Sequence, residues 1–120
     1  MPHPGRPQPL PADDDRPREE CGIFGIAGTR DAAAFTALGL HALQHRGQEA
    51  AGIVSAADGA FHSHKARGLV GDGFAEPDVI EALPGDAAIG HVRYATTGAT
   101  MTRNIQPLFA EFAFGGLALA

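Results

Sequence analysis

The sequence has a single cysteine, Cys21, and no tryptophan among its 120 residues. One cysteine cannot form an intramolecular disulfide, and it cannot build a cysteine-rich metal site within the chain. A lone cysteine is commonly a small buried hydrophobic residue. The thiol of Cys21 is therefore either part of a core or a group with a chemical role.

Basic residues and long apolar runs are also scarce. Lysine and arginine together number 9 against 14 aspartates and glutamates, for a formal charge of -5, and no basic stripe with interleaved aromatic residues points to a nucleic-acid partner. No segment approaches the roughly 18 consecutive apolar residues of a membrane span, and the N-terminus lacks the apolar stretch of a secretory signal. We therefore expect a cytoplasmic protein with no nucleic-acid or membrane partner.

Residues 1–20 differ in composition from the rest of the chain. Six of the nine prolines lie there, together with the acidic run Asp13-Asp14-Asp15. Such a segment has too little apolar surface to offset the entropy lost on ordering. We expect residues 1–20 to form an unfolded leader, and the folded part to begin at Cys21.

Hydrophobic periodicity and turn residues predict an α+β domain with antiparallel strands after the leader. An alanine-rich helix is expected to follow residues 28–31 and to end near His45, with Arg46-Gly47 as a glycine stop. Four apolar residues of that helix share one face: Phe35, Leu38, Ala42 and Leu43. The other expected elements are strands at 51–56 and 60–65 joined by the turn dipeptide Asp58-Gly59, a helix at 78–83, and strands at 21–27, 87–95 and, in two runs, 108–120.

Two local patterns resemble ligand-binding motifs, but a structural explanation without a ligand fits each of them better. Residues 68–73, G-L-V-G-D-G, lack the lysine of a phosphate-binding loop and the glycine spacing of a dinucleotide motif, so we expect a turn. His41 and His45 are four apart on a predicted helix, and His62 and His64 are two apart on a predicted strand. Neither pair has a third ligand nearby in the sequence, so we expect solvated or core histidines and no metal site.

The boundary position of Cys21 favours a chemical role. If the chain is cleaved before Cys21, one residue carries both the thiol and an α-amine, and an amine with a pKa of roughly 7.7 to 8.0 can act as the local base. A thiolate that attacks a carboxamide carbon forms a tetrahedral oxyanion and then a thioester, which water hydrolyses. The oxyanion requires backbone or amide donors, and Gly22 and Gly25 would let the backbone approach closely.

A second candidate group lies in the predicted strand at 87–95. The period of two places His91 and Arg93 on one face of the strand, opposite Val92 and Tyr94. An arginine can bind a substrate carboxylate through two parallel hydrogen bonds, but it can equally pair with a nearby acidic side chain. Spacing alone leaves both interpretations open.

Three separated segments resemble the glutaminase domain of amidophosphoribosyltransferases. They are C-G-I-F-G-I-A-G from Cys21, L-Q-H-R-G-Q-E-A-A-G-I from Leu43 and G-H-V-R-Y-A-T-T-G from Gly90. Their order and spacing also fit, and the resemblance covers nearly all of residues 21–120. Three motifs in register are far more specific than any one of them.

The resemblance implies an N-terminal-nucleophile hydrolase fold, a four-layer αββα sandwich that would be incomplete at the C-terminus. Residues 1–20 would be a propeptide removed before the nucleophile Cys21, and residues 21–120 the N-terminal part of a type-2 glutamine amidotransferase domain. Arg93 and the region of Thr96 would hold the glutamine carboxylate. Arg46 and Gly47 would help to shape the pocket around Cys21.

The resemblance also implies a reaction. Ammonia released from glutamine would pass to a phosphoribosyltransferase domain, absent from this chain, and displace pyrophosphate from phosphoribosyl pyrophosphate to give phosphoribosylamine, the first committed step of purine synthesis. No cofactor is expected in this segment, because Mg²⁺ belongs to the second domain; some leader-bearing members also carry a [4Fe-4S] cluster. The full-length enzyme is expected to be a homo-oligomer that binds glutamine and phosphoribosyl pyrophosphate.

Related families leave alternatives open. Glucosamine-6-phosphate synthases look similar, but they usually read Tyr-Arg-Gly-Tyr at residues 45–48 and have Trp in place of Tyr94. These relatives also have the exposed cysteine, so the expected glutamine hydrolysis is the same for either family. The Asn-Gly pair of the oxyanion hole would come just beyond Ala120, and loss of oxyanion donors costs about 100- to 1000-fold in rate. We therefore expect the 120-residue chain alone to be inactive, and an inactive glutamine-binding fragment is the third interpretation.

Overall fold

A four-stranded antiparallel sheet forms the centre of the protein. The computed structural model describes residues 20–44, 50–94, 105–112 and 115–120. The strand order is β1-β4-β2-β3, and each neighbouring pair is antiparallel. The strands are β1 (Glu20–Ala27), β2 (Ala50–Ala57), β3 (Ala60–Arg67) and β4 (Ala87–Tyr94).

The β2–β3 hairpin confirms the turn predicted at Asp58-Gly59. Ala57 pairs with Ala60, and the two residues between them have φ values of 51° and 78°. Both values lie in the left-handed region, which a two-residue hairpin loop of this kind requires and which glycine and aspartate tolerate. The local sequence therefore determines where this hairpin turns.

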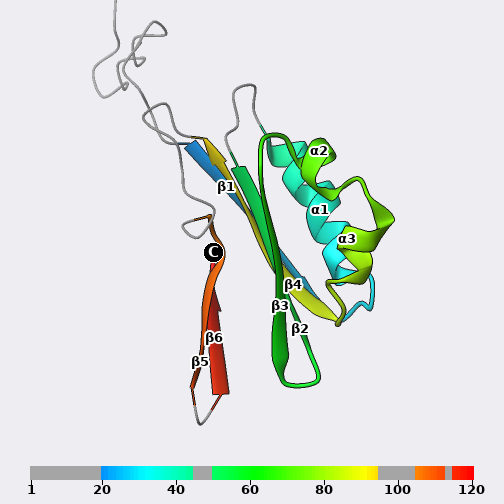
Figure 1. Cartoon of the computed structure of the whole chain (residues 1–120), viewed down its shortest axis with the longest axis vertical. Helices are drawn as coiled ribbons and strands as arrows, with labels where there is room; N and C mark the ends of the chain where they lie inside the picture. The colour runs from blue at the N-terminus through cyan, green and yellow to red at the C-terminus, as the bar shows by residue number, and fades with distance from the viewer. Residues whose placement is uncertain (1–19, 45–49, 95–104, 113–114) are drawn as a thin grey trace, which may run out of the picture.

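Three helices cover one face of the sheet, as Figure 1 shows. They are α1 (Ala32–Leu43), α2 (Val70–Phe74) and α3 (Pro77–Glu81). The core lies between these helices and the sheet. Its members share near-complete burial and come from both layers, and they include Ala33, Leu40, Ala51, Ile53, Phe74 and Val92.

The apolar face predicted for α1 is not the face that packs on the sheet: Phe35, Leu38 and Ala42 are exposed, and of the four predicted residues Leu43 approaches β1 at Gly22. The buried residues of α1 include Ala33, Thr36 and Leu40, whereas Leu38 is 66% exposed. A Cβ added to Gly90 of β4 would lie 2.6 Å from side-chain atoms of both Leu40 and Thr36. Small residues such as Ala33 and Gly90 thus allow a close approach, and Phe35 and Leu38 of the same helix are exposed.

A second, two-stranded sheet lies against the opposite face of the first. It consists of β5 (Leu108–Phe112) and β6 (Gly115–Leu119). The rings of Phe61 on β3 and Phe109 on β5 meet edge to face with their centroids 5.7 Å apart. The described residues therefore form a helical layer, a four-stranded sheet and a two-stranded sheet, which confirms the α+β class (Figure 1).

One local prediction was wrong, and one helix ends two residues before its predicted end near His45. Residues 68–73 were expected to form a turn, but α2 covers Val70–Phe74 because Val70 and Phe74, one helical turn apart, are both buried in the core and tertiary packing overrides the low helix propensity of glycine. Helix α1 ends at Leu43, before the glycine stop predicted at Arg46-Gly47, which lies outside the described residues. The chain turns away at Gln44, whose ψ of 147° is extended.

Candidate functional site

Cys21 lies at the start of β1, directly opposite Arg93 of β4. The register pairs the two residues, and paired residues of antiparallel strands point to the same face with Cβ atoms about 4.5 to 5.5 Å apart. That face is the one without helices, because Gly22 and Val92, the next pair along, contact Leu43 of α1 on the helical side. The Cys21 thiol is free and exposed.

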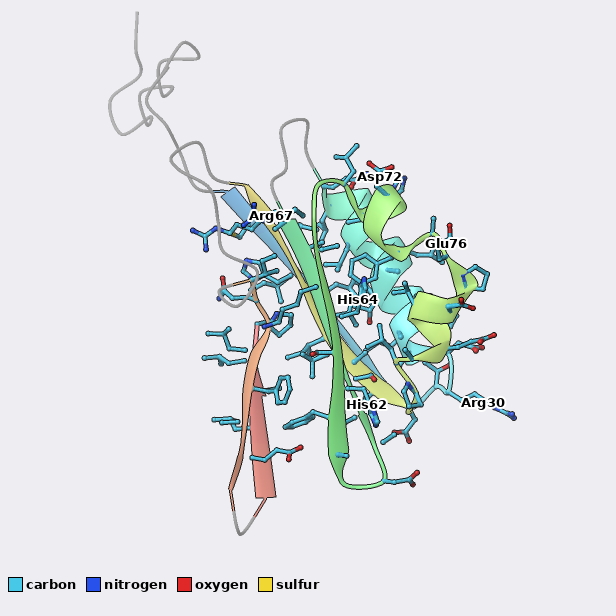
Figure 2. The ribbon with its side chains drawn as sticks, viewed as in Figure 1. Arg30, His62, His64, Arg67, Asp72 and Glu76 are labelled. Atoms are coloured by element: carbon cyan, nitrogen blue, oxygen red, sulfur yellow. The ribbon has the colours of Figure 1, made fainter. Side chains whose placement is uncertain are left out.

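The same row of the sheet continues across two further strands. Arg93 pairs with Ala50 of β2, and Ala50 pairs with Arg67 of β3. Two guanidinium groups therefore lie on the same face and in the same row as the thiol of Cys21. Figure 2 shows Arg67 on the side of the sheet that faces away from the helices.

Arg67 is a candidate that the sequence did not single out. No motif surrounds it, and only the successive pairing of four strands places it in line with Cys21. The positive charge of this row attracts an anionic group such as an α-carboxylate.

His91 lies in the next row of the same face, between Ile23 of β1 and Gly52 of β2. It is 4% exposed, and its ring nitrogens have no hydrogen-bond partner within the described ranges. Burial, followed by the charge of Arg93, lowers the pKa of His91 below its ordinary value. The imidazole beside Arg93 is thus held neutral.

A segment that precedes β5 covers this part of the face. A Cβ added to Gly52 would overlap the carbonyl oxygen of Gln106, and Ile105 is 1% exposed. Glycine at position 52 lets the backbone of Gln106 rest directly on β2 beside His91. This contact explains how His91 is buried on a face that carries no helix.

Three of the expected site residues fall outside the described part of the chain. They are Arg46, Gly47 and Thr96. The structure does describe the residues that flank them. Gln44 directly follows α1, Ala50 pairs with Arg93, and Tyr94 pairs with Glu20. The described ends of these segments therefore lie at the same end of the sheet as Cys21.

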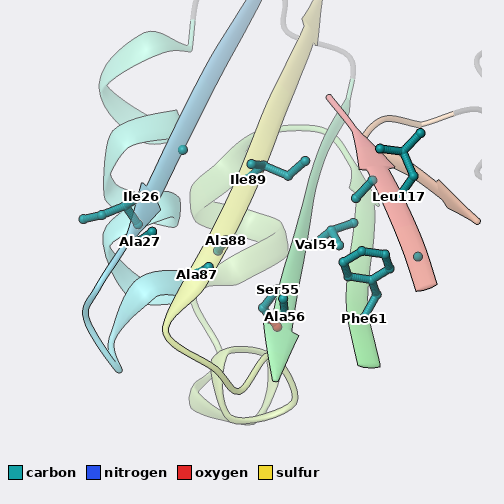
Figure 3. A pocket seen from close by; sticks show the side chains of 13 residues that line it. Ile26, Ala27, Val54, Ser55, Ala56, Phe61, Ala87, Ala88, Ile89 and Leu117 are labelled. Carbon is teal, nitrogen blue, oxygen red and sulfur yellow. The ribbon is translucent and has the colours of Figure 1, made fainter. Parts of the chain in front are cut away.

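An apolar cavity lies elsewhere, between the two sheets. It has a volume of about 530 Å³ and is lined by apolar residues such as Val54, Phe61, Ile89 and Leu117, which Figure 3 shows facing one another. Neither Cys21 nor Arg93 lines it. A cavity with so few polar groups is suited to apolar packing between sheets and not to binding a zwitterionic amino acid.

The predicted histidine pairs take different positions. His62 and His64 lie on the helical face of β3, since they pair with Ser55 and Ile53, and the ring of His64 meets that of Phe74 edge to face at 5.2 Å. His41 lies on α1, and His45 lies outside the described residues. Within the described ranges no three histidine, cysteine or acidic side chains come close enough to hold a metal ion, and no helix there is long and apolar enough to span a membrane.

The fold and the site together define an α+β protein with an exposed cysteine opposite an arginine at one end of a sheet. No protein-family model matches the chain. The amidophosphoribosyltransferase of Rhizobium etli is 59% identical over 110 residues, which are 92% of this chain and 22% of that protein. The chloroplastic amidophosphoribosyltransferase of Vigna aconitifolia is 53% identical over 90% of this chain and 22% of its own length.

Solved structures agree with these relatives. The glutamine phosphoribosylpyrophosphate amidotransferase of B. subtilis, complexed with ADP and GMP, is 44% identical with a TM-score of 0.70 over 82% of this chain and 21% of that chain. A structure described as the allosteric regulatory enzyme of purine biosynthesis has a TM-score of 0.73, also at 44% identity, over 80% of this chain and 21% of its own.

The chain is therefore a homologue of the amidophosphoribosyltransferases across about nine tenths of its length. It spans about a fifth of the length of these relatives. This similarity confirms the family inferred from the three motifs.

Proposed function

We propose that this chain is the glutamine-hydrolysing part of an amidophosphoribosyltransferase, with Cys21 as the nucleophile. The pairing of Cys21 with Arg93 carries the proposal. It puts a thiol and a guanidinium group side by side on an open face of the sheet, where one small amino acid can reach both with its two ends. The names of the relatives support glutamine as the substrate.

The chemistry needs a free α-amine on Cys21. In the unprocessed chain the nitrogen of Cys21 belongs to the peptide bond with Glu20, and both residues are part of β1. An amide nitrogen is not a base, so cleavage between Glu20 and Cys21 is the activating step of the proposal. Residues 1–19 lie outside the described part of the chain.

After cleavage, the amine takes the proton of the Cys21 thiol, and the thiolate sulfur attacks the amide carbon of glutamine. The carbon–nitrogen bond breaks as the amine returns the proton to the departing nitrogen, which leaves as ammonia. Water then attacks the thioester, breaks the carbon–sulfur bond and releases glutamate. The net reaction converts glutamine and water into glutamate and ammonia.

Arg93 would hold the α-carboxylate of glutamine, with Thr96 beside it and Arg46 and Gly47 around the pocket. A bidentate pair between guanidinium and carboxylate sets the direction of the substrate as well as its affinity. With the carboxylate held at Arg93, the side chain of glutamine extends toward Cys21. Arg67, in the same row of the sheet, adds positive potential on the other side of Ala50.

In the complete enzyme the ammonia would react with phosphoribosyl pyrophosphate, displacing pyrophosphate to form phosphoribosylamine. We assign that half of the reaction, its Mg²⁺ and any iron–sulfur cluster to other parts of the complete enzyme. We further propose that the complete domain is a four-layer αββα sandwich. The face-to-face contact of the two sheets through Phe61 and Phe109 supports this arrangement.

The proposal is tested on the longest form of the protein that cells make. Intact mass and N-terminal sequencing should show a mature chain that begins at Cys21, and that chain should release ammonia from glutamine. A glutamine analogue with an electrophilic carbon in place of the amide should add to Cys21 alone. Pyrophosphate release that depends on both glutamine and phosphoribosyl pyrophosphate identifies the acceptor.

Two other outcomes would each replace the proposal. A mature chain that hydrolyses glutamine but does not consume phosphoribosyl pyrophosphate would assign this segment to another glutamine amidotransferase, such as a glucosamine-6-phosphate synthase. A chain that keeps Met1 to Glu20 and binds glutamine without hydrolysing it would be a glutamine-binding protein, because the amine of Cys21 would remain an amide.

A further inference from the structure

A buried histidine lies directly beside the two residues of the proposed site. His91 belongs to the row next to that of Cys21 and Arg93, on the face of the sheet without helices, and it is two residues from Arg93 on β4. Diagonal neighbours on adjacent strands, such as His91 and Cys21, are about 7 to 8 Å apart, a distance that an aromatic ring can span. The imidazole is therefore close enough to influence both residues.

The imidazole is held between the sheet and the chain that covers it. A Cβ added to Gly52, the partner of His91 on β2, would overlap the carbonyl oxygen of Gln106. Ile105 and Pro107, on either side of Gln106, are both almost completely buried. His91 itself is only 4% exposed, so its ring has little freedom to move.

Arg93 has few other bulky neighbours on this face. Three of its four neighbours on the adjacent strands are small, namely Cys21, Ala50 and Gly52, and the fourth, Ile23, is largely exposed. An arginine side chain has many rotamers, and ordering it costs conformational entropy. The buried ring of His91 limits those rotamers on the side of Arg93 that faces away from the end of the sheet.

The charged side chains that the four strands place on this face are all basic: Arg93, Arg67 and Lys65. Lys65 lies in the row of His91, on the other side of Gly52. Neither the neighbouring positions of β1 and β2 nor the segment from Ile105 to Pro107 brings a carboxylate to His91. A protonated imidazole would therefore add a further positive charge to a cationic surface, which is electrostatically unfavourable.

The acidic residue of the second sheet is too far along the sheet to change this. Glu111 of β5 pairs with Gly116, and a Cβ added to Gly116 would approach the ring of Phe61. Phe61 is four residues from Lys65 on β3, toward the hairpin turn. Burial, followed by the charge of Arg93, lowers the pKa of His91, and the described surroundings contain no nearby anion that would raise it.

His91 can act on its neighbours through its shape and its lack of charge. Both ring nitrogens are buried, and neither has a hydrogen-bond partner among the residues that the structure describes. The ring therefore does not position Arg93 through a hydrogen bond in this structure. Its volume and its neutrality are the two properties that remain.

We propose that His91 is a positioning residue for Arg93: a neutral side chain, held under the segment from Ile105 to Pro107, that keeps the guanidinium group on the side of Cys21. This inference rests on the function proposed above, in which Arg93 binds the α-carboxylate of glutamine. It adds a residue whose ring nitrogens are buried and which acts on the substrate through Arg93.

Two substitutions separate the volume of the side chain from its ring nitrogens. His91→Leu keeps a side chain of similar volume and removes both the nitrogens and the possibility of charge, whereas His91→Ala leaves the space beside Arg93 empty. Val92→Ala is the matched control. Val92 is the next residue of β4 and similarly buried, but it contacts the helical side of the sheet.

The first test measures kcat and KM for glutamine with the longest mature form of the protein. We expect His91→Ala to raise the KM about tenfold with a smaller change in kcat, because Arg93 is less well placed while Cys21 is retained. Above neutral pH, His91→Leu should keep the KM within about threefold of the unsubstituted protein. Val92→Ala should change the KM by less than about twofold although it lowers stability.

A pH series tests whether the ring must be neutral. Because the pKa of His91 is lowered, the ring is neutral above about pH 6.5 and takes up a proton only below it. The KM of the unsubstituted protein should therefore rise below that pH, by at most about tenfold per pH unit for one proton. His91→Leu should lack this rise, which a purely structural role of His91 would not produce.

A second readout does not depend on glutamine. The Nε atom of Arg93 is buried, so we expect its proton to exchange slowly with water. Exchange followed by NMR should become faster in His91→Ala and stay slow in His91→Leu and Val92→Ala. If the unsubstituted protein does not hydrolyse glutamine, the proposed function fails, whereas the exchange rates still support or refute the positioning of Arg93.

Three results would overturn the inference. In the first, His91→Ala lowers stability but changes neither the KM nor the exchange of the Arg93 proton, so His91 only fills space. In the second, His91→Leu is as impaired as His91→Ala above neutral pH, so the ring nitrogens are required. In the third, the KM rises equally at low pH in His91→Leu and in the unsubstituted protein, so another group is responsible for the pH dependence.

Discussion

The two faces of the four-stranded sheet differ in how completely they are covered. The helical face is closed: Leu40 and Ile53 are completely buried there, and Gly90 allows the helix to approach the strands. The opposite face is partly open: Ile23 is 58% exposed, Cys21 is exposed, and an apolar cavity of about 530 Å³ separates the two sheets. The difference indicates that stability comes mainly from the helical face, while the groups to which we assign chemistry lie on the other.

The arrangement has a physical advantage. Side chains alternate between faces along each strand, so a rigid packed core on one side can hold reactive groups on the other side at fixed spacings. Cys21 and Arg93 need no hydrogen bond to each other, because the backbone ladder between β1 and β4 sets their separation. Four predictions, ordered from the largest expected effect to the smallest, test whether the two faces are independent.

The largest effect should come from the open face. Cys21→Ala removes the proposed nucleophile, and we expect glutamine hydrolysis to fall by at least about 1000-fold in the mature protein. The thermal unfolding temperature should stay nearly constant, since the Cys21 side chain is exposed. Ammonia release and calorimetry on the same samples check both parts; a large fall in unfolding temperature would show that the faces are not independent.

A core substitution should have the converse effect. Leu40→Ala empties a completely buried site between α1 and β4, and we expect it to cost about 2 to 5 kcal/mol of unfolding free energy. Leu38→Ala on the same helix, and Ile23→Ala on the open face, should each cost under about 1 kcal/mol because both side chains are largely exposed. Urea unfolding measures all three; equal losses would contradict the contrast between the faces.

Arg93 should affect substrate affinity more than turnover. Arg93→Lys keeps the charge but loses the bidentate geometry, and we expect a rise of about 10- to 100-fold in the KM for glutamine with a smaller fall in kcat. Arg67→Lys, two strands away in the same row, is the matched control and should change the KM by less than about threefold. Similar effects at both positions would instead indicate a diffuse electrostatic role.

The smallest effect concerns pH. Because burial and then Arg93 lower the pKa of His91 in the folded protein, the unfolded chain binds the proton more readily as the pH falls below about 6.5. The stability contributed by neutral His91 is complete above that pH and is lost as the pH falls below it, with a slope of at most about 1.4 kcal/mol per pH unit for one proton.

His91→Gln should remove this part of the pH dependence, while His62→Gln, at a half-exposed position on the helical face of β3, should leave it in place. Urea unfolding between pH 5 and pH 8, on the scale over which histidine ordinarily titrates, makes the comparison. An unchanged pH profile in His91→Gln would mean that other groups carry the dependence.

Much of the secondary structure could be predicted from local patterns. The Asp58-Gly59 hairpin, the helix α3 after Glu76 and the strand β4 were found because turn residues and short periodicities act over a few residues. Helix α2 was missed for the same reason. Its two glycines argue locally against a helix, and its stability depends on Val70 and Phe74 reaching a core built from distant parts of the chain.

Parts of the candidate site could likewise be predicted from local patterns, and other parts could not. The sequence identified Cys21 from its place after the leader and Arg93 from its motif, but no local pattern could align Arg67 with them or bury His91 under Gln106. Those placements depend on strand register, and a shift of one residue would move every side chain to the other face. The cytoplasmic location, the cofactors and the homo-oligomer remain predictions.

By itself, the sequence determined the hairpin turn and most of the strands and helices, and it led to the predictions of a leader over residues 1–20 and of Cys21 and Arg93 as site residues; β1 in fact begins at Glu20. Composition, turns and motifs are local properties, so they can be analysed without the fold. Only the tertiary structure decided which face of α1 is buried, that the backbone of Gln106 covers the row of His91, and that Cys21 and Arg93 stand side by side at the end of a sheet. Those results depend on contacts between residues far apart in the chain, and their geometry follows from strand pairing and core packing.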